Sequence, residues 1–299
     1  MTDTALGTSA ALAATETLES PARRAWRRLV RHKGAMLGLA VIAIFILLAV
    51  FAPMIVPYDP IAASWSLVRK APSAQHWFGT DELGRDVLAR VVFGARASLL
   101  AGLISVSIAL AIGVPLGLVA GYRGGFIDAL ISRITDAMLA CPFLILAIAL
   151  AAFLGPSLGN AMIAIGVSAT PIFIRLTRGQ VMSVKVEDYV EAARAMGNPR
   201  WRIALVHILP NILPALLVQA TLSIAAAIIA EAALSYLGLG TQPPQPSWGR
   251  MLNDAQTLLF QSPMLAVYPG AAIAIAVLGL NLLGDGLRDL LDPRLAQER

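Results

Sequence analysis

The sequence has little charge and almost no cysteine. Asp, Glu, Lys and Arg make up 14% of its 299 residues, whereas 58% are hydrophobic, which is far too apolar for an ordinary soluble protein. A single cysteine, Cys141, excludes an intrachain disulfide. The composition therefore predicts a membrane protein. The net charge of +5 fits a membrane surface better than nucleic acid, because no basic patch carries interleaved aromatic residues.

Patterns typical of catalysis and nucleotide binding are also missing. The three histidines, His32, His76 and His207, lie far apart, and no pair has the spacing of zinc ligands. The chain has no glycine-rich loop followed by Lys and Ser or Thr, and no Gly-x-Ser-x-Gly motif. We therefore expect no enzyme activity, cofactor or metal on this chain, and the energy for any transport has to come from a partner.

Long uncharged runs predict an all-α membrane protein with six transmembrane helices. Residues 34–58, 97–122 and 137–174 carry no charge, and about 20 apolar residues suffice to cross the hydrocarbon core as a helix. The longest run is interrupted at Gly155-Pro156-Ser157, so it supplies two spans. The expected spans are 35–55, 97–119, 132–154, 158–175, 212–234 and 264–284.

The distribution of positive charge predicts the orientation. With both termini in the cytoplasm, about three quarters of the 23 Lys and Arg fall on the cytoplasmic side, as the positive-inside rule requires. A signal peptide is the alternative for the first run, but the long preceding tail and the length of the run argue against it. The expected parts are a cytoplasmic tail at 1–34, disordered and then basic, a first span at 35–55, an extracytoplasmic loop at 56–96, a five-helix core at 97–284 and a cytoplasmic tail at 285–299.

A charged, amphipathic segment at residues 176–211 lies between the apolar runs. Asp188 is a suitable N-cap, and Glu191 stands three residues later, where a capping box places an acid. The helix that follows, from Tyr189, has about two turns. Gly197 can end it in the left-handed conformation.

A second short helix is expected after this bend. Asn198 can cap it, and Pro199 suits its first turn. Pro210 lacks a backbone N–H, so we expect the helix to stop at Leu209. Such a pair of helices can fit a groove in a soluble partner; the alternative is an amphipathic hairpin at the membrane interface without a partner.

These residues resemble a known motif. Glu191-Ala192-Ala193, then Gly197, then Ile208-Leu209-Pro210 resembles the coupling loop on which the ATPase docks in permease subunits of bacterial ABC importers. The family usually has Ile where this chain has His207, and His is common there in peptide-type permeases. Residues 76–99, 235–249 and 284–293 resemble the dipeptide, oligopeptide and nickel permeases, so the resemblance covers about residues 25–294.

The resemblance implies a type I ABC importer permease bundle with cytoplasmic coupling helices in the bacterial inner membrane. It implies these partners: a homologous permease subunit, two ABC ATPase subunits, an extracytoplasmic substrate-binding protein and membrane lipid, with ATP and magnesium only on the ATPases. The substrate stays open among dipeptide, oligopeptide, nickel and glutathione, because selectivity in this family rests largely with the binding protein. The ATPase-coupling residues expected here are Asp188, Tyr189, Glu191, Ala192, Ala193, Gly197, Pro199, Leu209 and Pro210.

Glu231 and Gln219 are polar residues within the fifth expected span. An ionisable residue inside a span is a functional candidate by default, so both are possible pathway residues. The alternatives are hydrogen bonds between helices and, for Glu231, hydration at the outer end of the span. A stand-alone secondary transporter or channel is the alternative function, and it is disfavoured because no internal repeat is visible. A membrane enzyme is disfavoured by the missing catalytic residues.

Two further patterns concern packing. Asp81, Arg85, Asp86 and Arg90 have spacings that allow them to pair along a helix beginning near Asp81. This stretch is interpreted as an interfacial segment that seals the bundle rather than as a substrate contact. Close helix approach in the second span is expected at its small residues, which include Gly102, Gly113 and Gly117.

Overall fold

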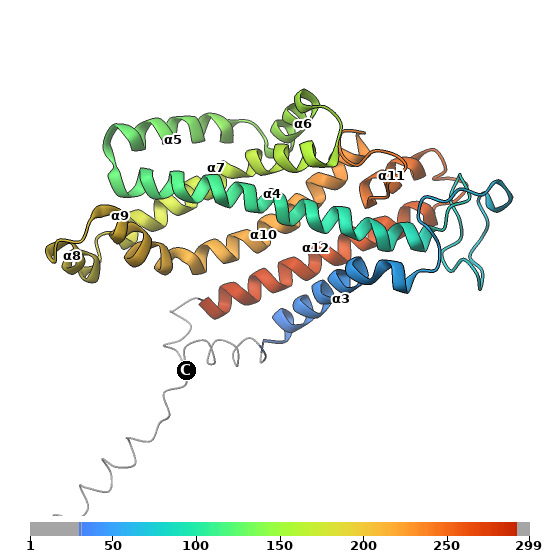
Figure 1. The fold of residues 1–299 in the computed structure, drawn as a ribbon, viewed down its shortest axis with the longest axis horizontal. Coiled ribbons are helices and arrows are strands. Elements are labelled where there is room, and N and C mark those ends of the chain that lie inside the picture. Colours follow the sequence, from blue (N-terminus) through green and yellow to red (C-terminus); the bar gives the residue numbers. More distant parts are fainter. Residues whose placement is uncertain (1–29, 31, 292–299) are drawn as a thin grey trace, which may run out of the picture.

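The computed structural model describes Val30 and residues 32–291, and almost all of this part is helical (Figure 1). Five of the described helices are long and apolar enough to cross a membrane, and the bent pair α5–α6 raises the number to six. Among the described residues there is no β-strand, only a single bridge between Thr80 and Asp86. The all-α expectation is therefore confirmed. The long helices are α3 (Lys33–Ile55), α4 (Val87–Arg123), α5 (Gly125–Ala140), α6 (Phe143–Leu154), α7 (Leu158–Val184), α10 (Leu209–Tyr236) and α12 (Met264–Leu291).

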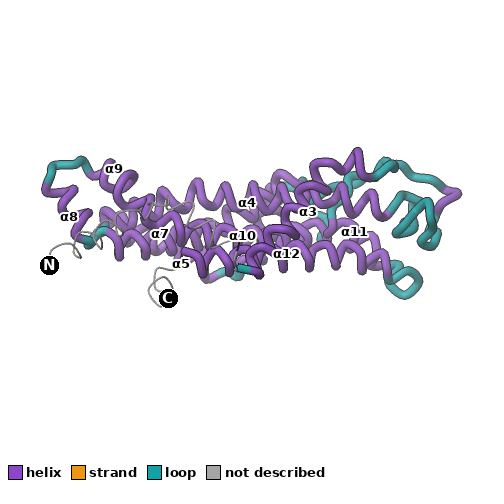
Figure 2. The backbone as a smooth tube through the Cα atoms, turned by 90° about the horizontal axis from the view of Figure 1, so that it is seen from below, coloured by secondary structure: helices purple, strands orange, loops and turns teal. Residues whose placement is uncertain are grey.

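Short helices lie at the two ends of this elongated bundle (Figures 1 and 2). One end carries α8 and α9, and we call it the α8 end. The other carries α11 and the loop between α3 and α4, and we call it the α11 end. The short elements are η1 (Trp65–Leu67), α8 (Asp188–Ala195), α9 (Arg200–Arg202), the π-helix η2 (Ile203–Ile208) and α11 (Trp248–Gln256). Helix α11 lies in a segment for which only a loop was expected.

The third expected span, 132–154, is wrong as a single straight helix. It is divided between α5 and α6, which meet at an angle of 93°. Cys141 between them is extended, because the ring of Pro142 disfavours the helical conformation in the preceding residue. The apolar run predicted the hydrophobicity correctly but not this bend.

Helices α4 and α7 approach closely along a row of glycines. Gly113, Gly117 and Gly121 follow one another at every fourth position of α4, and a Cβ atom on Gly117 would lie 2.6 Å from the Cβ of Thr177 on α7. A Cβ on Gly113 would lie 2.6 Å from that of Phe173. The close approach expected at Gly113 and Gly117 is therefore confirmed, and it fits small-residue packing of membrane helices.

Helices α3 and α12 lie together on one side of α4 and α10, whereas α5 and α6 lie on the opposite side (Figure 1). Gly38 on α3 crosses α12 so tightly that a Cβ would lie 2.5 Å from the carbonyl oxygen of Gly279. Helix α12 continues to Leu291, so the tail expected at 285–299 begins as helix. The expected disordered segment at 1–20 and most of the basic cluster lie outside the described residues.

Candidate functional site

The α8–α9 hairpin, residues 188–202, projects from the α8 end of the bundle (Figures 1 and 2). One face of α8 is anchored, because Val190 and Ala193 are buried in the same hydrophobic cluster as Ile203 and Ile208. These positions are three residues apart on α8 and therefore share one face. The hairpin is thus a packed extension of the bundle rather than a free loop.

The hairpin exposes large apolar side chains together with charged ones. Tyr189 is 44% exposed, Met196 75% and Trp201 66%, while Ala192, Glu191 and Arg194 are also exposed. Burial and the charge of Glu187 raise the pKa of Tyr189, so its phenol stays neutral. Exposed apolar patches with a polar rim are typical of protein interaction sites. The sequence prediction missed Met196 and Trp201, although bulky apolar residues beside Gly197 in a charged segment were the available signal.

The capping box expected at Asp188 and Glu191 is wrong. Glu187 is the N-cap residue and makes no capping bond through its side chain. The Glu191 carboxylate instead lies 3.8 Å from the guanidinium of Arg194. The carboxylate therefore faces the following turn rather than the start of the helix.

Replacing Glu191 with alanine is expected to leave the free energy of unfolding almost unchanged. The side chain is 65% exposed and pairs only with an exposed arginine, and such surface pairs contribute about 0–1 kcal/mol. Thermal unfolding of the purified chain measures this. A loss of more than about 2 kcal/mol, the upper range for a real cap, would contradict the observed geometry.

The bend after α8 has the conformation that the sequence predicts. Gly197 has a φ of +79°, in the left-handed region that ends helices. Asn198 does not cap the second helix as expected: its side-chain amide donates to the carbonyl of Ala193, 3.0 Å away, and so closes the end of α8. Pro199 directly precedes α9.

The expected stop at Pro210 is also wrong. The helix runs without interruption from Arg200 to Tyr236. The π-helix η2 lies just before the proline. At its end the amide of Leu209 donates to the carbonyl of Ala204, five residues earlier. The wider turn makes room for a ring that would clash with a regular helix. Leu209 and Pro210 therefore lie inside one long helix, Arg200–Tyr236, which we call the rod. It joins the hairpin to the far end of the bundle.

Glu231 lies near the far end of this rod and is fully buried, with 0% exposure. Its carboxyl group accepts hydrogen bonds from Ser235 on the same helix at 2.6 Å and from Ser98 on α4 at 3.0 Å. The alternative of a hydrated carboxylate is therefore wrong. Gln219 donates to Ser223, one turn further along α10, at 3.2 Å. In this structure both residues bond neighbouring side chains.

Replacing Glu231 with leucine is expected to destabilise the bundle, whereas glutamine should be tolerated. Leucine leaves the buried hydroxyls of Ser98 and Ser235 without their acceptor, which costs about 1–3 kcal/mol per unsatisfied group; glutamine keeps one acceptor oxygen. Thermal unfolding in detergent compares the two, with Gln219→Leu as the control at a half-buried site. Equal stability of both Glu231 variants, together with lost transport, would contradict the structural role.

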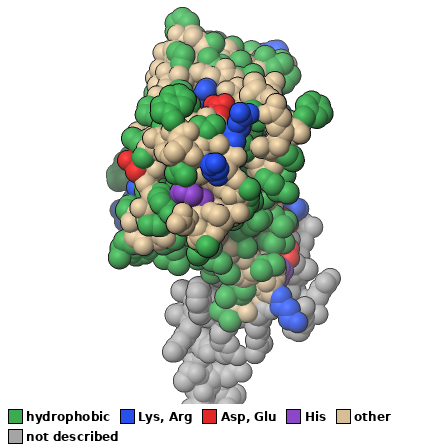
Figure 3. Space-filling model, turned by 90° about the vertical axis from the view of Figure 1, so that its right-hand side faces the viewer, with side chains coloured by type: hydrophobic (Ala, Val, Ile, Leu, Met, Phe, Trp, Pro, Cys, Tyr) green, Lys and Arg blue, Asp and Glu red, His purple; other side chains and the backbone are tan. Residues whose placement is uncertain are grey.

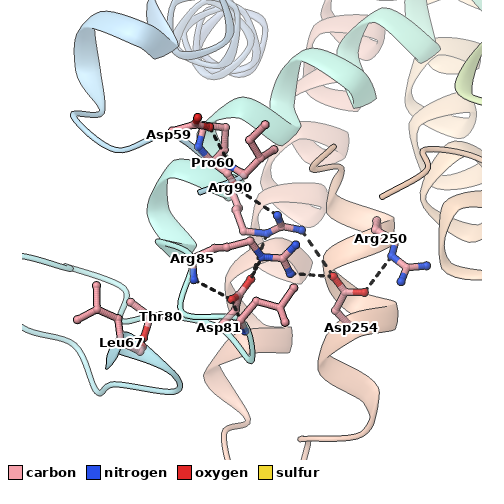
Figure 4. Close-up of polar contacts among 11 residues, drawn as sticks. Asp59, Pro60, Leu67, Thr80, Asp81, Arg85, Arg90, Arg250 and Asp254 are labelled. Atoms are coloured by element: carbon pink, nitrogen blue, oxygen red, sulfur yellow. Dashed lines mark hydrogen bonds and ion pairs between the residues drawn. The ribbon is translucent and has the colours of Figure 1, made fainter. Parts of the chain in front are cut away.

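At the α11 end, five charged residues, three of them buried, form a cluster (Figure 4). Asp81 pairs with Arg85 at 2.6 Å and with Arg90 at 3.4 Å, and both arginines reach Asp254 on α11 at 3.6 Å. Arg250 pairs with the same aspartate at 2.9 Å. The expected pairing of Asp81 with Arg85 and Arg90 is therefore confirmed, and Arg250 and Asp254 were its missed members. The cluster joins the loop between α3 and α4 to α11.

The helix expected from Asp81 begins later. Asp86 caps α4 by accepting from the amide of Ala89 at 2.7 Å, and its other oxygen bonds His76 at 2.8 Å. Burial and the charge of Asp254 raise the pKa of the neighbouring Glu82. Arg85 and Arg90 are buried, and this end presents hydrophobic side chains and only a few charges (Figure 3). The cluster therefore links the loop between α3 and α4 to α11.

The described residues contain no group of three or more His, Cys, Asp or Glu that could hold a metal ion.

Residues 113–297 match the family described as binding-protein-dependent transport system inner membrane component, and residues 20–72 match the N-terminal TM domain of oligopeptide transport permease C. The chain belongs to this permease family. It is the membrane component of an ABC importer and not an enzyme.

Relatives are similar over nearly the whole chain. The dipeptide transport system permease protein of Alkalihalophilus pseudofirmus is 49% identical over 93% of this chain and 92% of its own length. The glutathione transport system permease protein of Escherichia coli O157:H7 is 44% identical, covering 94% and 93%. Among solved structures, an inward-facing form of the MetNI methionine ABC transporter aligns with a TM-score of 0.57 and 20% identity, covering 68% of this chain and 97% of that chain. That likeness supports the fold.

Proposed function

We propose that this permease subunit and a homologous permease together form the pathway by which short peptides cross the bacterial inner membrane. The observation that carries the proposal is the α8–α9 hairpin. It exposes Tyr189, Met196 and Trp201, and its second helix, which carries Trp201, is continuous with span α10. The named relatives transport dipeptides and glutathione. These substrates are short peptides with free ammonium and carboxylate groups. Nickel is the alternative substrate of the proposed importer.

In the proposed arrangement, both termini and the hairpin face the cytoplasm, where two ABC ATPase subunits bind. ATP and magnesium are held by those subunits. An extracytoplasmic binding protein delivers the peptide to the α11 end. Closure of the ATPase pair moves the hairpin, and the rod from Arg200 to Tyr236 carries that movement to the outer half of the bundle, which requires two alternative packings of the helices. The proposed role of Asp188, Glu191, Ala192 and Pro199 is to contact the ATPase or shape the hairpin.

The test is isolation of the importer through a tag on this chain, followed by reconstitution in liposomes. We expect an ATPase pair and a second permease to co-purify, and uptake of a labelled dipeptide to require ATP and the binding protein. Uptake of nickel but not of any peptide would assign the other substrate class. Ion-coupled uptake by the isolated chain would instead support the stand-alone transporter and refute the proposal.

A further inference from the structure

Helix α3 differs in charge from α5 and α7. Helix α3 carries no charged residue after Lys33, and its exposed large side chains are apolar, for example Leu47 and Val50. On the opposite side, α5 and α7 are joined by two ion pairs. Asp128 on α5 bonds Arg178 on α7 through two contacts of 2.5 and 2.8 Å. Asp136 bonds Arg175 at 2.7 Å. Helices α5 and α7 are therefore linked by two ion pairs, whereas the exposed side chains of α3 after Lys33 are uncharged.

The two ion pairs differ in the solvent exposure of their side chains. The Asp128 and Arg178 side chains are 17% and 34% exposed, as expected for a link between packed helices. The Asp136 and Arg175 side chains are 59% and 63% exposed. Charged side chains are costly against hydrocarbon and normally face a protein interior or a water-filled cavity. The α5–α7 surface around the second pair is thus unsuited to lipid and suited to an aqueous passage.

The second pair lies further along the bundle than the first. Asp136 is about two helical turns, or about 12 Å, further from the α8 end than Asp128. It stands about one turn before the bend between α5 and α6, which begins at Cys141. On α7, Gly179 is exposed one turn from Arg175, and a Cβ there would meet no atom within 4 Å. The exposed pair therefore has open space beside it on the side of the α8 end.

We propose that Asp136 and Arg175 form a substrate subsite on the wall of the transport pathway, which takes the terminal ammonium and carboxylate groups of a short zwitterionic peptide. This inference rests on the proposed import of peptides. The Arg175 guanidinium donates to the peptide carboxylate, and the Asp136 carboxylate accepts from its ammonium group. Without substrate the two side chains neutralise each other. Their bond is exposed and therefore weak, so a peptide can displace it.

The position of the subsite is tested by thiol labelling of the assembled importer. In a Cys141→Ser background, Gly179→Cys is expected to react with a water-soluble, charged thiol reagent, and to react more slowly while a dipeptide is being transported. Leu47→Cys, on the exposed apolar face of α3, is the matched control and should stay unlabelled. A Gly179→Cys variant that resists labelling, in an importer that still transports dipeptide, overturns the inference.

The chemistry of the subsite is tested by substrate analogues. With the binding protein saturated, Arg175→Gln should lower the uptake rate of a dipeptide with a free carboxylate about tenfold, the effect of losing one charge-assisted hydrogen bond, and should spare its C-terminal amide. Asp136→Asn should show the same contrast between a free and an acetylated amino terminus. Asp128→Asn, in the more buried pair, is the control and should affect all substrates equally.

The outcomes separate this inference from the proposed function. If Arg175→Gln slows the free peptide and the amide equally, the exposed pair only links α5 to α7, and the subsite is refuted while peptide import stands. If the wild-type importer transports no dipeptide, the proposed function itself fails. A charge-dependent contrast together with labelling at Gly179→Cys supports the subsite.

Discussion

Replacing Gly117 with leucine is expected to prevent the bundle from packing. A Cβ atom at this position would already lie 2.6 Å from the Cβ of Thr177 and 2.7 Å from the backbone carbonyl oxygen of Ile174. A backbone atom cannot move away unless the whole of α7 moves, so overpacking here should reach or exceed the usual cost of about 1–3 kcal/mol. The yield of monodisperse protein and its melting temperature in detergent measure the effect.

The matched control for this prediction is Gly270→Leu on α12. A Cβ at Gly270 would meet no atom within 4 Å, and leucine is a good helix former, so the melting temperature should stay close to that of the wild type. If Gly117→Leu and Gly270→Leu melted at the same temperature as the wild type, α4 and α7 would not be in the close contact described above.

Replacing Gly197 with valine is expected to reduce ATP-dependent uptake by at least about tenfold while the chain still inserts into the membrane. The φ of +79° is unfavourable for a β-branched residue by about 1–2 kcal/mol, so the hairpin should lose the bend that orients its apolar face. No atom lies within 4 Å of the added Cβ, so the effect is one of backbone conformation and not of collision. Uptake and the amount of co-purifying ATPase are the measurements.

Asparagine at position 197 separates an effect of backbone conformation from an effect of the added side chain. Asn adopts the left-handed conformation more readily than other non-glycine residues, so Gly197→Asn should retain much of the uptake and of the ATPase binding. Equal loss in both variants would show that the side chain itself is not tolerated at the hairpin. Wild-type uptake in both would show that the bend has no part in coupling.

Elements that depend on nearby residues were predictable from the sequence. The runs around α3, α10 and α12 are uncharged over enough residues to specify membrane helices, and Gly197 specifies the end of α8. The predictions failed where two local preferences compete. Pro142 bends the third span, whereas Pro210 leaves its helix continuous because η2 widens the turn before it. Sequence patterns alone do not show which proline a helix accommodates.

The sequence by itself determined that this chain is a helical membrane permease, because hydrocarbon excludes long charged segments and because the motif from Glu191 to Pro210 lies within one short stretch. Only the tertiary structure decided what the polar residues do. Glu231 meets Ser98 across 133 positions, and Asp136 meets Arg175 across 39. Such contacts depend on how helices pack, and packing in a membrane is set by shape along whole helix faces rather than by any local pattern.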